Sequence, residues 1–520
     1  MGLGGNLHMR VAAVDVGSNS IHMVVAKVES DGRFYVLDRA KEMVRLGRQT
    51  LSTGHLSSEA IEAGVRTLGA FRTLAERQGV TRIKAVATSA VREASNGGDF
   101  IQQVRKDVGL RIKVIPGPEE ARLIYLGVRH AIDLGDEPAL IVDIGGGSVE
   151  LILVEHGQPI TLDSVKLGVA RLSEQFLPSD PPSSKEIAEL QEHVSHHLGP
   201  VLARALKHRV RRVIGTSGTL LNVASIGGYM RGDPPNGHLN NFVVTADEVH
   251  KVRRLLAKTA REDRARIKGL DSKRTDLIVA GACLIDHIMS EVHAEQLTAC
   301  TWSLREGVLL DFIARHQKGI EESERFATPR QRSVARLARH LGETSEHGSR
   351  VAALASSLYD QLGSQIGLAE AAREWLEFAA LLHDVGHHID HKNHHKHAYY
   401  LITNGELLGF EREEVEIIAL TARYHRKAPP KESDPEYASL SPEAKQIVRA
   451  LSALLRVADA LDRSHYGAVG AVKAVLEDGH LTLGLTTAGQ DAALEIWEAR
   501  QRVGLLEQLL GVDVQFRVTS

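Results

Sequence analysis

Residues 14–25 read VDVGSNSIHMVV, and residues 142–153 repeat the pattern as VDIGGGSVELIL. In each copy a run rich in Val and Ile leads into Asp-x-Gly-x-x-Ser, and a second apolar run follows. Short apolar runs separated by small residues are typical of two strands joined by a tight turn. Because self-similarity along a chain indicates a duplicated structural unit, the copies predict two equivalent β-hairpins, one in each half of an N-terminal module.

Helix and strand patterns alternate outward from these two copies. Apolar residues recur at helical spacing over residues 61–75, and residues 82–88 form a strand pattern. After the second copy, a strand over 210–214 runs into Gly215-Thr216-Ser217-Gly218-Thr219, and residues 275–288 predict a buried helix. The alternation predicts two α/β domains, residues 10–135 and 136–318, with helices packed on their sheets.

The pattern changes near residue 320. Helical periods dominate residues 325–468, with helices expected around 351–358, 375–382 and 447–461. Residues 469–520 then combine a strand over 481–485, a helix over 492–510 and a last strand over 512–518. These patterns predict an all-α domain followed by a small α+β C-terminal cap.

Composition narrows the class of protein. The chain has 520 residues, 43% hydrophobic and 25% charged, which excludes a disordered, collagen-like or coiled-coil chain. Aromatic residues are only 4%, and the net charge is −3, so neither ring stacking nor a basic field draws the chain to DNA, RNA or a membrane. No apolar run is long enough to cross a bilayer, and we expect a cytoplasmic protein.

Two further features fit that interpretation. Cys283 and Cys300 lie far from any C-x-x-C spacing and are expected to be core residues in a reducing compartment. Met9 is a candidate start, so we expect residues 1–9 to be a dispensable leader.

The repeated turn is a candidate phosphate cradle. Glycines let backbone N–H groups approach an anion, and the Ser and Asn side chains add donors. A cleft lined by both turns could hold adjacent phosphoryl groups, with Asp15 and Asp143 near a divalent cation such as Mg²⁺, which prefers oxygen ligands. The alternative, two unrelated hairpin turns, is disfavoured by the matching apolar flanks.

Four further motifs make the pattern specific: ATSAVR at 87–92, VIPGPEEARLIY at 114–125, GTSGT at 215–219 and LREGVL at 304–309. With the two repeats, and in this order over residues 10–315, they resemble the exopolyphosphatase/guanosine pentaphosphate phosphatase (Ppx/GppA) family of the actin-like ATPase superfamily. The resemblance implies two duplicated ribonuclease H/actin-like domains.

The resemblance also implies roles for individual residues. Glu120 corresponds to the family's catalytic glutamate, while Asp143 and Glu150 would hold Mg²⁺ (or Mn²⁺) and position water, with Asp15 as a further metal candidate. The residues that would bind phosphoryl oxygens are Ser18, Asn19, Ser20, Arg92, Gly145, Gly146, Gly147 and Ser148. A guanidinium suits Arg92 for this role because it forks onto phosphate and stays charged.

Glu120 also makes chemical sense as a base. Hydrolysis of a terminal phosphoanhydride needs a group that takes a proton from water. Glu120 opens an amphipathic stretch behind Pro116-Gly117-Pro118, so it is expected near a helix N-terminus that points into a cleft. The alternative is that Glu119 and Glu120 only favour the helix dipole.

The all-α part carries a second candidate site. Seven of the 26 histidines fall between His383 and His397. His347, the pair His383-Asp384, and Asp459 lie on separate expected helices and resemble the pattern of HD-type metal phosphohydrolases; helices of one bundle can aim such groups at one ion. His397 and His425 could complete a two-metal set. In the family this domain is commonly described as degenerate, and this sequence departs by keeping all four ligand positions.

The stretch His391-Lys392-Asn393-His394-His395-Lys396-His397 allows two interpretations. With Arg423, Arg426 and Lys427 it could form a basic rim that guides polyphosphate, or it could be a solvated loop.

We therefore expect a Mg²⁺-dependent exopolyphosphatase that releases terminal orthophosphate from inorganic polyphosphate. The nearest alternative is a guanosine pentaphosphate (pppGpp) 5′-phosphohydrolase, which needs the same site. An ATP-binding kinase or filament protein is a further class, as is a non-enzymatic polyphosphate or alarmone sensor with catalysis only at the histidine site, which would hold a second divalent metal. We expect a homodimer, with no nucleic-acid or membrane partner.

Overall fold

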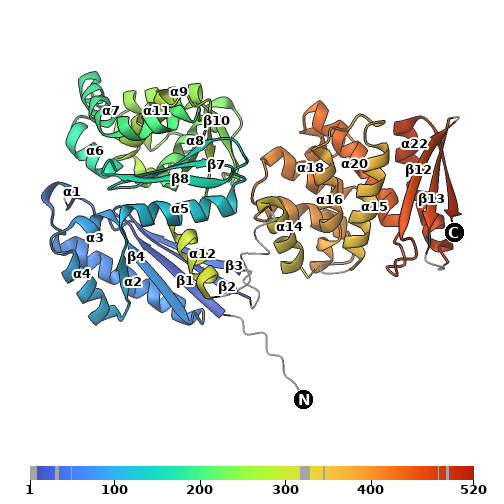
Figure 1. The fold of residues 1–520 in the computed structure, drawn as a ribbon, viewed down its shortest axis with the longest axis horizontal. Coiled ribbons are helices and arrows are strands. Elements are labelled where there is room, and N and C mark those ends of the chain that lie inside the picture. The colour runs from blue at the N-terminus through green and yellow to red at the C-terminus, as the bar shows by residue number, and fades with distance from the viewer. Residues whose placement is uncertain are drawn as a thin grey trace, which may run out of the picture. The chain divides into compact units, whose positions relative to one another are not determined.

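The computed structural model describes residues 9–29, 34–48, 50–316, 328–342, 346–477, 479–487 and 491–519. The chain divides into two compact units, Met1–Pro329 (unit 1) and Arg330–Ser520 (unit 2), shown in Figure 1. The expected leader lies outside the described residues, apart from Met9, which begins the first strand.

The first sheet of unit 1 is built around the first copy of the repeat (Figure 1). Its strand order is β3 (Phe34–Glu42), β2 (Ile21–Val28), β1 (Met9–Val16), β4 (Arg82–Ala87) and β5 (Ile112–Val114). β1 pairs antiparallel with β2 and parallel with β4. The predicted hairpin and the strand expected at 82–88 are both confirmed.

The second sheet repeats this arrangement around the second copy. Its strand order is β10 (Val243–Thr245), β11 (Gln296–Ala299), β9 (Arg212–Thr216), β6 (Ala139–Ile144), β7 (Val149–Glu155) and β8 (Gln158–Val165). β6 pairs antiparallel with β7 and parallel with β9, as β1 does with β2 and β4. The matching topology explains the sequence repeat as two related α/β halves.

The helices of unit 1 cover these sheets. α2 (Ser58–Arg77) is the helix expected over 61–75; Ser57 caps its first turn, and its apolar face, Leu68, Phe71 and Ala75, is buried. α11 (Ile278–Glu291) is the predicted buried helix, starting three residues later than expected. The remaining helices are α1 (Thr50–Thr53), α3 (Ser89–Glu93), α4 (Gly97–Gln103), α5 (Gly117–Ala131), α6 (Val169–Phe176), α7 (Ser184–Lys207), α8 (Ser217–Arg231), α9 (Ala246–Lys258), α10 (Arg261–Arg264) and α12 (Leu304–His316).

Helix α12 returns to the first half. It packs along α5 and contacts β1, β2 and β4, although it follows the last strand of the second sheet in the chain. A Cβ on Gly127 would lie 2.5 Å from the Ser303 carbonyl oxygen, so glycine permits this close approach of α5 and α12. Residues 304–316, assigned from sequence to domain 136–318, therefore pack with elements of the first half; the boundaries at 135 and 318 stay a prediction.

One strand lies further along the chain than expected. β9 covers Arg212–Thr216 rather than 210–214, because Gly215 and Thr216 continue the ladder opposite Val142 and Asp143. Two residues of the GTSGT motif thus belong to the strand, and helix α8 begins directly at Ser217.

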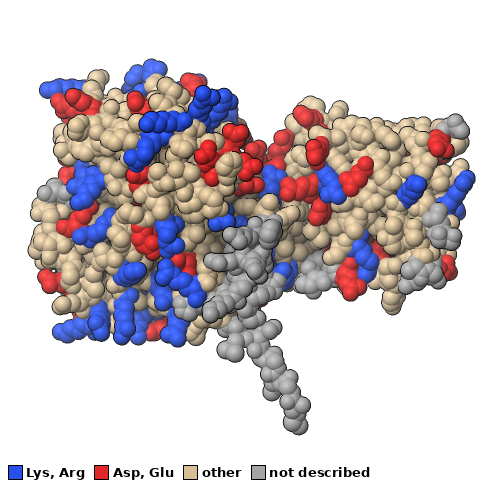
Figure 2. Space-filling view, in the orientation of Figure 1, with Lys and Arg blue, Asp and Glu red and all other residues tan. Residues whose placement is uncertain are grey.

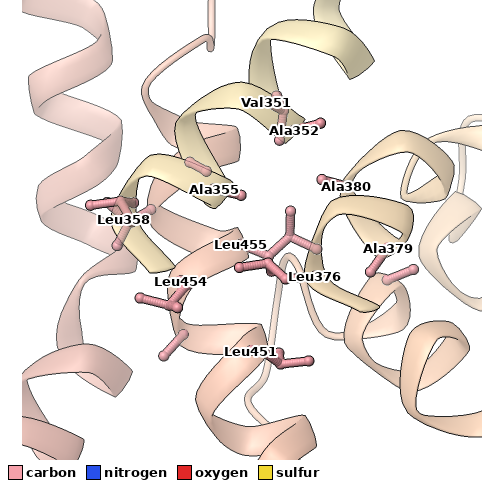
Figure 3. Close-up of a cluster of buried hydrophobic side chains, with 14 of the residues drawn as sticks. Val351, Ala352, Ala355, Leu358, Leu376, Ala379, Ala380, Leu451, Leu454 and Leu455 are labelled. Atoms are coloured by element: carbon pink, nitrogen blue, oxygen red, sulfur yellow. The ribbon is translucent and has the colours of Figure 1, made fainter. Parts of the chain in front are cut away.

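Unit 2 opens with a helical bundle, as predicted for residues 325–468. Its helices are α14 (Pro329–His340), α15 (Glu346–Leu362), α16 (Ala372–Leu382), α17 (His394–Asn404), α18 (Arg412–Arg423), α19 (Pro435–Ala438) and α20 (Pro442–Ala460). Figure 3 shows α15, α16 and α20 meeting through Leu358, Leu376 and Leu455, which are fully buried. His347 lies on α15, Asp459 lies on α20, and His383 directly follows α16.

The C-terminal residues form a small sheet with two helices. Its order is β12 (Ala471–Glu477), β13 (His480–Thr486) and β14 (Asp513–Thr519), which confirms the α+β pattern. The single helix expected over 492–510 is instead two, α21 (Ala493–Arg502) and α22 (Gly504–Leu510). The Leu506 amide bonds to the Val503 carbonyl at 2.8 Å between N and O, a tighter turn at a glycine of low helix propensity.

The distribution of surface charges and the state of the two cysteines agree with the expectations from the composition. Figure 2 shows Lys and Arg intermixed with Asp and Glu over the visible face of each unit. Cys283 and Cys300 are buried free thiols, as expected. Among the described residues, no helix combines the length and apolarity that a bilayer span requires.

Candidate functional site

The two repeated turns share one closing hydrogen bond. The Gly17 amide donates to the Ser20 carbonyl (3.2 Å between N and O), and the Gly145 amide donates to the Ser148 carbonyl (3.0 Å). A Cβ would lie 3.0 Å from that oxygen at Gly17 and 3.1 Å at Gly145, so each turn favours a residue without a side chain there. The matching geometry explains why Gly recurs at this place in both copies.

The two turns also touch each other. A Cβ added to Gly146 would lie 3.0 Å from Ser18 Cβ and 3.3 Å from the Asn19 nitrogen. Gly147 packs even more closely against Ser89, whose Oγ is 2.9 Å from Ser18 Oγ. Hairpins from the two halves of unit 1 therefore converge, as the repeat predicts.

Both turns line one cavity of about 380 Å³. With the exception of Arg92, every residue predicted for this site lies on its wall: Asp15, Ser18, Asn19, Ser20, Glu120, Asp143, Gly145, Gly146, Gly147, Ser148 and Glu150. The structure thus brings together residues that are more than 130 positions apart in the chain.

Helix α5 carries Glu120 to this cavity. The helix begins after Pro116, and Glu119 and Glu120 lie in its first turn, as expected. The two carboxylates differ: Glu119 pairs with Arg122 on the helix surface (2.7 Å, Oε2 to Nε), whereas the Glu120 side chain is only 8% exposed. Burial raises the pKa of Glu120 to about 7 against the opposing effect of Arg92, so this carboxylate can exchange a proton near neutral pH.

Arg92 lies behind Glu120 rather than on the cavity wall. Its Nη1 is 3.0 Å from Glu120 Oε2 and 2.7 Å from the Ile115 carbonyl oxygen. The ion pair holds the Glu120 carboxylate in place. Both of these contacts are to acceptors of the protein itself. Phosphate binding by Arg92 remains a prediction.

Four carboxylates share the cavity wall: Asp15, Glu120, Asp143 and Glu150. Burial, followed by the charge of Glu120, raises the pKa of Asp15 to about 8 and raises that of Glu150 well above its ordinary value. Burial likewise raises the pKa of Asp143, although Ser303 Oγ donates to its Oδ2 at 2.5 Å. Such a cluster is costly unless protons or a cation neutralise it.

The donor set fits a hard divalent cation. All four side chains offer oxygens, which Mg²⁺ and Mn²⁺ prefer. Asp15 Oδ1 is buried and has no hydrogen-bond partner, which leaves a carboxylate oxygen available as a ligand. Asp143 and Glu150 face each other across the β6–β7 pair, which places their side chains on the same face of the sheet.

Cations on the cavity wall were missed in the sequence interpretation. Arg274, Arg305 and Lys41 line the same cavity as the carboxylates. Arg305 belongs to the LREGVL motif and its Nη1 is 3.2 Å from His22 Nδ1, so that motif was the available signal. Arg274 has no sequence signal; burial lowers its pKa and that of Lys41, since burial disfavours the charged forms.

Unit 2 gathers the predicted histidine residues into a second cluster. His347, His383 and Asp459 lie within metal-ligand range of one another, and Asp384 adjoins them. Their helices are α15, the end of α16 and α20, as the bundle prediction required. His387 and His394 join the cluster through Asp384, and no sequence argument had singled them out from the histidine-rich stretch.

Two expectations about this stretch were wrong. His397 belongs to none of the candidate metal groups among the described residues; His394 is the histidine that joins His425 beside Asp384. Residues 391–397 are also not one exposed loop, because α17 begins at His394 and buries His394 and His395. Helical periodicity turns His394 inward and leaves Lys396 outward, so a basic rim can use only part of the stretch.

Comparison with known proteins locates both units in one family. A model of the Ppx/GppA phosphatase family matches residues 24–316, and a model of Ppx/GppA phosphatase, domain III, matches residues 330–496.

Solved structures agree with the first match. A crystal structure of an Aquifex aeolicus Ppx/GppA family member is 27% identical and covers 60% of this chain and 100% of that chain, with a TM-score of 0.51. The crystal structure of an exopolyphosphatase from Cytophaga hutchinsonii is 29% identical and covers 59% of this chain and 98% of that one, with a TM-score of 0.56.

Proposed function

The chain belongs to the Ppx/GppA phosphatase family, and from that membership we propose that it is an exopolyphosphatase. In this proposal it uses Mg²⁺ or Mn²⁺ to release terminal orthophosphate from inorganic polyphosphate in the cytoplasm. The observation that carries the proposal is that Glu120, a buried carboxylate with a pKa of about 7, shares one cavity with both glycine turns. The solved Cytophaga hutchinsonii relative, described as an exopolyphosphatase, supports the same substrate class.

The two glycine turns would bind the terminal phosphoryl groups of polyphosphate. In this proposal the turns' other backbone amides and the hydroxyls of Ser18, Ser20 and Ser148 would donate to a tetrahedral anion, and no side chain at Gly145–Gly147 would obstruct it. Arg274, Arg305 and Lys41 add positive charge on the same wall. This distribution suits a terminal phosphoryl group and its neighbour better than a neutral ligand.

Asp15, Asp143 and Glu150 would hold the divalent cation. When bound, the cation supplies charge neutralisation at the phosphoryl oxygens. The Ser303 hydroxyl fixes Asp143, and the Ser164 hydroxyl donates to Glu150 Oε1 at 2.7 Å, so both carboxylates keep one orientation. Fixed orientation matters because phosphoryl transfer depends chiefly on positioning and electrostatics.

Glu120 would act as the general base. Its carboxylate takes a proton from a water molecule, the water oxygen bonds to the terminal phosphorus, and the bridging P–O bond breaks. The shortened polyphosphate leaves with the bond's electron pair, and orthophosphate is released. Arg92 keeps Glu120 aimed and favours its ionised form at the start of the cycle.

The decisive test compares two variants. Glu120→Gln should lower polyphosphatase turnover by about 10²- to 10⁴-fold, the usual contribution of a general base. A variant with His383→Ala and Asp384→Ala should keep most of it. Phosphate release would be measured from long-chain polyphosphate, pppGpp and ATP.

Each substrate outcome separates the proposal from its alternatives. Faster release from pppGpp than from polyphosphate would assign the chain to the guanosine pentaphosphate phosphohydrolases. Tight ATP binding in calorimetry would favour a kinase-like protein. Full polyphosphatase activity in Glu120→Gln, with loss in the histidine-site variant, would leave unit 1 as a sensor.

A further inference from the structure

Ser20 of the first glycine turn lies beside a histidine whose two ring nitrogens both have partners. His22 Nε2 is 2.7 Å from Ser20 Oγ, and His22 Nδ1 is 3.2 Å from Nη1 of Arg305. All three side chains line the Glu120 cavity. A serine hydrogen-bonded to a histidine can be a nucleophile beside its base, so the position of the ring proton decides what this pair can do.

The guanidinium of Arg305 fixes that proton. Every N–H group of an arginine donates and none accepts, so Nδ1 of His22 presents its lone pair to Arg305. Burial, followed by the charge of Arg305, lowers the pKa of His22 well below its ordinary value, in agreement with a neutral ring. A neutral imidazole carries one ring proton, and in His22 this proton therefore lies on Nε2.

The contact between His22 and Ser20 thus has one direction. The Nε2–H group donates and Ser20 Oγ accepts, so His22 has no lone pair with which to take the proton of the serine hydroxyl. The hydroxyl hydrogen of Ser20 remains available to an acceptor in the cavity. A bound phosphoryl group would supply that acceptor, since its oxygens carry negative charge.

Arg305 is itself held in place by its neighbour in the chain. It is the second residue of α12, and its Nε is 2.9 Å from Oε1 of Glu306, whose side chain is fully buried. The other oxygen of Glu306 accepts the Ser303 amide at 3.0 Å. Hydrogen bonds in a chain polarise one another, so an anchored cation at one end makes the Ser20 hydroxyl a stronger donor at the other.

The internal repeat places His22 where the second copy has Glu150. The two residues occupy the same position in VDVGSNSIHMVV and VDIGGGSVELIL. Each also lies opposite the aspartate of its own copy in the strand pairing, His22 opposite Asp15 and Glu150 opposite Asp143. A carboxylate only accepts, whereas the neutral imidazole donates through Nε2. The same position therefore has opposite hydrogen-bonding character in the two halves of unit 1.

We propose that His22 is a positioning residue that orients the Ser20 hydroxyl as a donor to the terminal phosphoryl group, so that Ser20 is a phosphate ligand and not a nucleophile. This inference rests on the proposed function, because it assigns a task to side chains of the cavity in which polyphosphate would bind. It adds that hydrolysis proceeds without a phosphoserine at Ser20.

Binding of inorganic phosphate tests the positioning role without turnover. Calorimetry in the presence of Mg²⁺ gives the affinity of the full-length wild type and of each variant. Ser20→Ala removes the donor and should weaken binding roughly 10- to 100-fold, the range expected for a hydrogen bond to a charged group. His22→Leu should weaken binding to a similar extent. The control is His238→Leu, at an exposed histidine of unit 1 outside the cavity, which should bind like the wild type.

A double variant separates positioning from a general loss of structure. If His22 acts only through Ser20, the variant with both His22→Leu and Ser20→Ala should bind phosphate like Ser20→Ala alone. His22→Gln should restore most of the affinity, because its amide can accept from Arg305 and donate to Ser20. His22→Asn is too short to reach Ser20 and should resemble His22→Leu. Circular dichroism and thermal melting verify folding; if His22→Leu fails to fold, His22→Asn replaces it.

The absence of a phosphoserine is tested with radiolabelled polyphosphate. A phosphate ester of serine withstands acid, so wild-type protein quenched in acid during turnover should carry no label on Ser20 when its peptides are analysed. Ser20→Ala should also keep measurable polyphosphatase activity, because it loses a binding contact and not the group that attacks phosphorus.

Each result decides the matter. Additive losses in the double variant, or a His22→Gln variant as weak as His22→Leu, would overturn the positioning role. Phosphate binding that is absent from the wild type, or unchanged in Ser20→Ala, would remove Ser20 as a ligand. Label on Ser20 would make it a nucleophile. Full polyphosphatase activity in Glu120→Gln would refute the proposed function alone, since the phosphate affinities of the His22 variants do not depend on turnover.

Discussion

The guanidinium of Arg92 lies 3.0 Å from the carboxylate of Glu120, measured from Nη1 to Oε2, and its other contact is the Ile115 carbonyl just before helix α5. One side chain thus ties the α3 segment to the start of the helix that carries Glu120. Since burial raises the pKa of Glu120 and Arg92 opposes that rise, the pair sets the proton affinity of the proposed base.

Replacing Arg92 should therefore move the pH profile of catalysis. A base is active when ionised, so activity rises with pH through the Glu120 pKa of about 7. Arg92→Ala removes the cation that lowers this pKa, and the acid limb of kcat against pH should move to higher pH. Arg122→Ala is the matched control. Arg122 lies on α5 with Glu120 but pairs with Glu119 and Asp311 instead, so its removal should leave the acid limb in place. An unmoved acid limb in Arg92→Ala would mean that Glu120 is not the titrating base.

Proton release should accompany Mg²⁺ binding. With a pKa raised to about 8, Asp15 is largely protonated at pH 7 and must lose its proton to serve as a ligand. Mg²⁺ affinity should therefore increase as pH rises toward 8. Calorimetry in buffers of different ionisation enthalpy measures the protons released, and Asp15→Asn should release fewer. Equal release from the variant and the wild type would exclude Asp15 from the cation site.

Contact between the two turns should be essential for activity. A methyl group on Gly146 would lie 3.0 Å from Ser18 Cβ, so Gly146→Ala forces the turns apart and should lower kcat/KM on every substrate by about tenfold or more. Gly69→Ala is the control, since a Cβ there meets nothing within 4 Å and alanine favours the surrounding helix α2. Wild-type kinetics in Gly146→Ala would show that activity does not depend on close contact between the two turns.

Arg274 should contribute to substrate binding. It lines the cavity, and hydrogen bonds between charged groups contribute about 1.5–3 kcal/mol. Arg274→Ala should raise KM for polyphosphate by roughly 10- to 100-fold if the contact is equally strong throughout the reaction. Arg266→Ala, which removes an exposed arginine paired with Asp263, should leave KM unchanged. Similar KM values for both variants would place the phosphates elsewhere on the wall.

Unit 2 should lose stability when its bundle core is truncated. Leu455 is fully buried between α15, α16 and α20 (Figure 3), and Leu→Ala at such positions costs about 2–5 kcal/mol. Leu494→Ala, at a side chain that is half exposed, should cost much less. Chemical denaturation followed by circular dichroism gives both values, and equal losses would show that the core repacks around the cavity.

The repeat, the class of each region and the candidate phosphate-binding residues could all be predicted from the sequence alone. Local patterns carry that information: strand–turn–strand alternation around Asp-x-Gly-x-x-Ser, helical spacing over 61–75, and acidic residues in the first turn of α5 all depend on neighbours in the chain. Because these patterns are local, the predicted starts of β9 and α11 were wrong by a few residues. Strand pairing and helix packing determine where those elements begin.

Which distant groups meet became clear only from the folded structure. Arg92 pairs with Glu120, a contact that the sequence did not predict, and Arg274 lines the cavity without any sequence signal. His394 replaced His397 beside Asp384 because α17 begins at His394 and one face of that helix is buried. Long-range packing governs such contacts, and a pattern read along the chain does not contain the distances between residues brought together by folding.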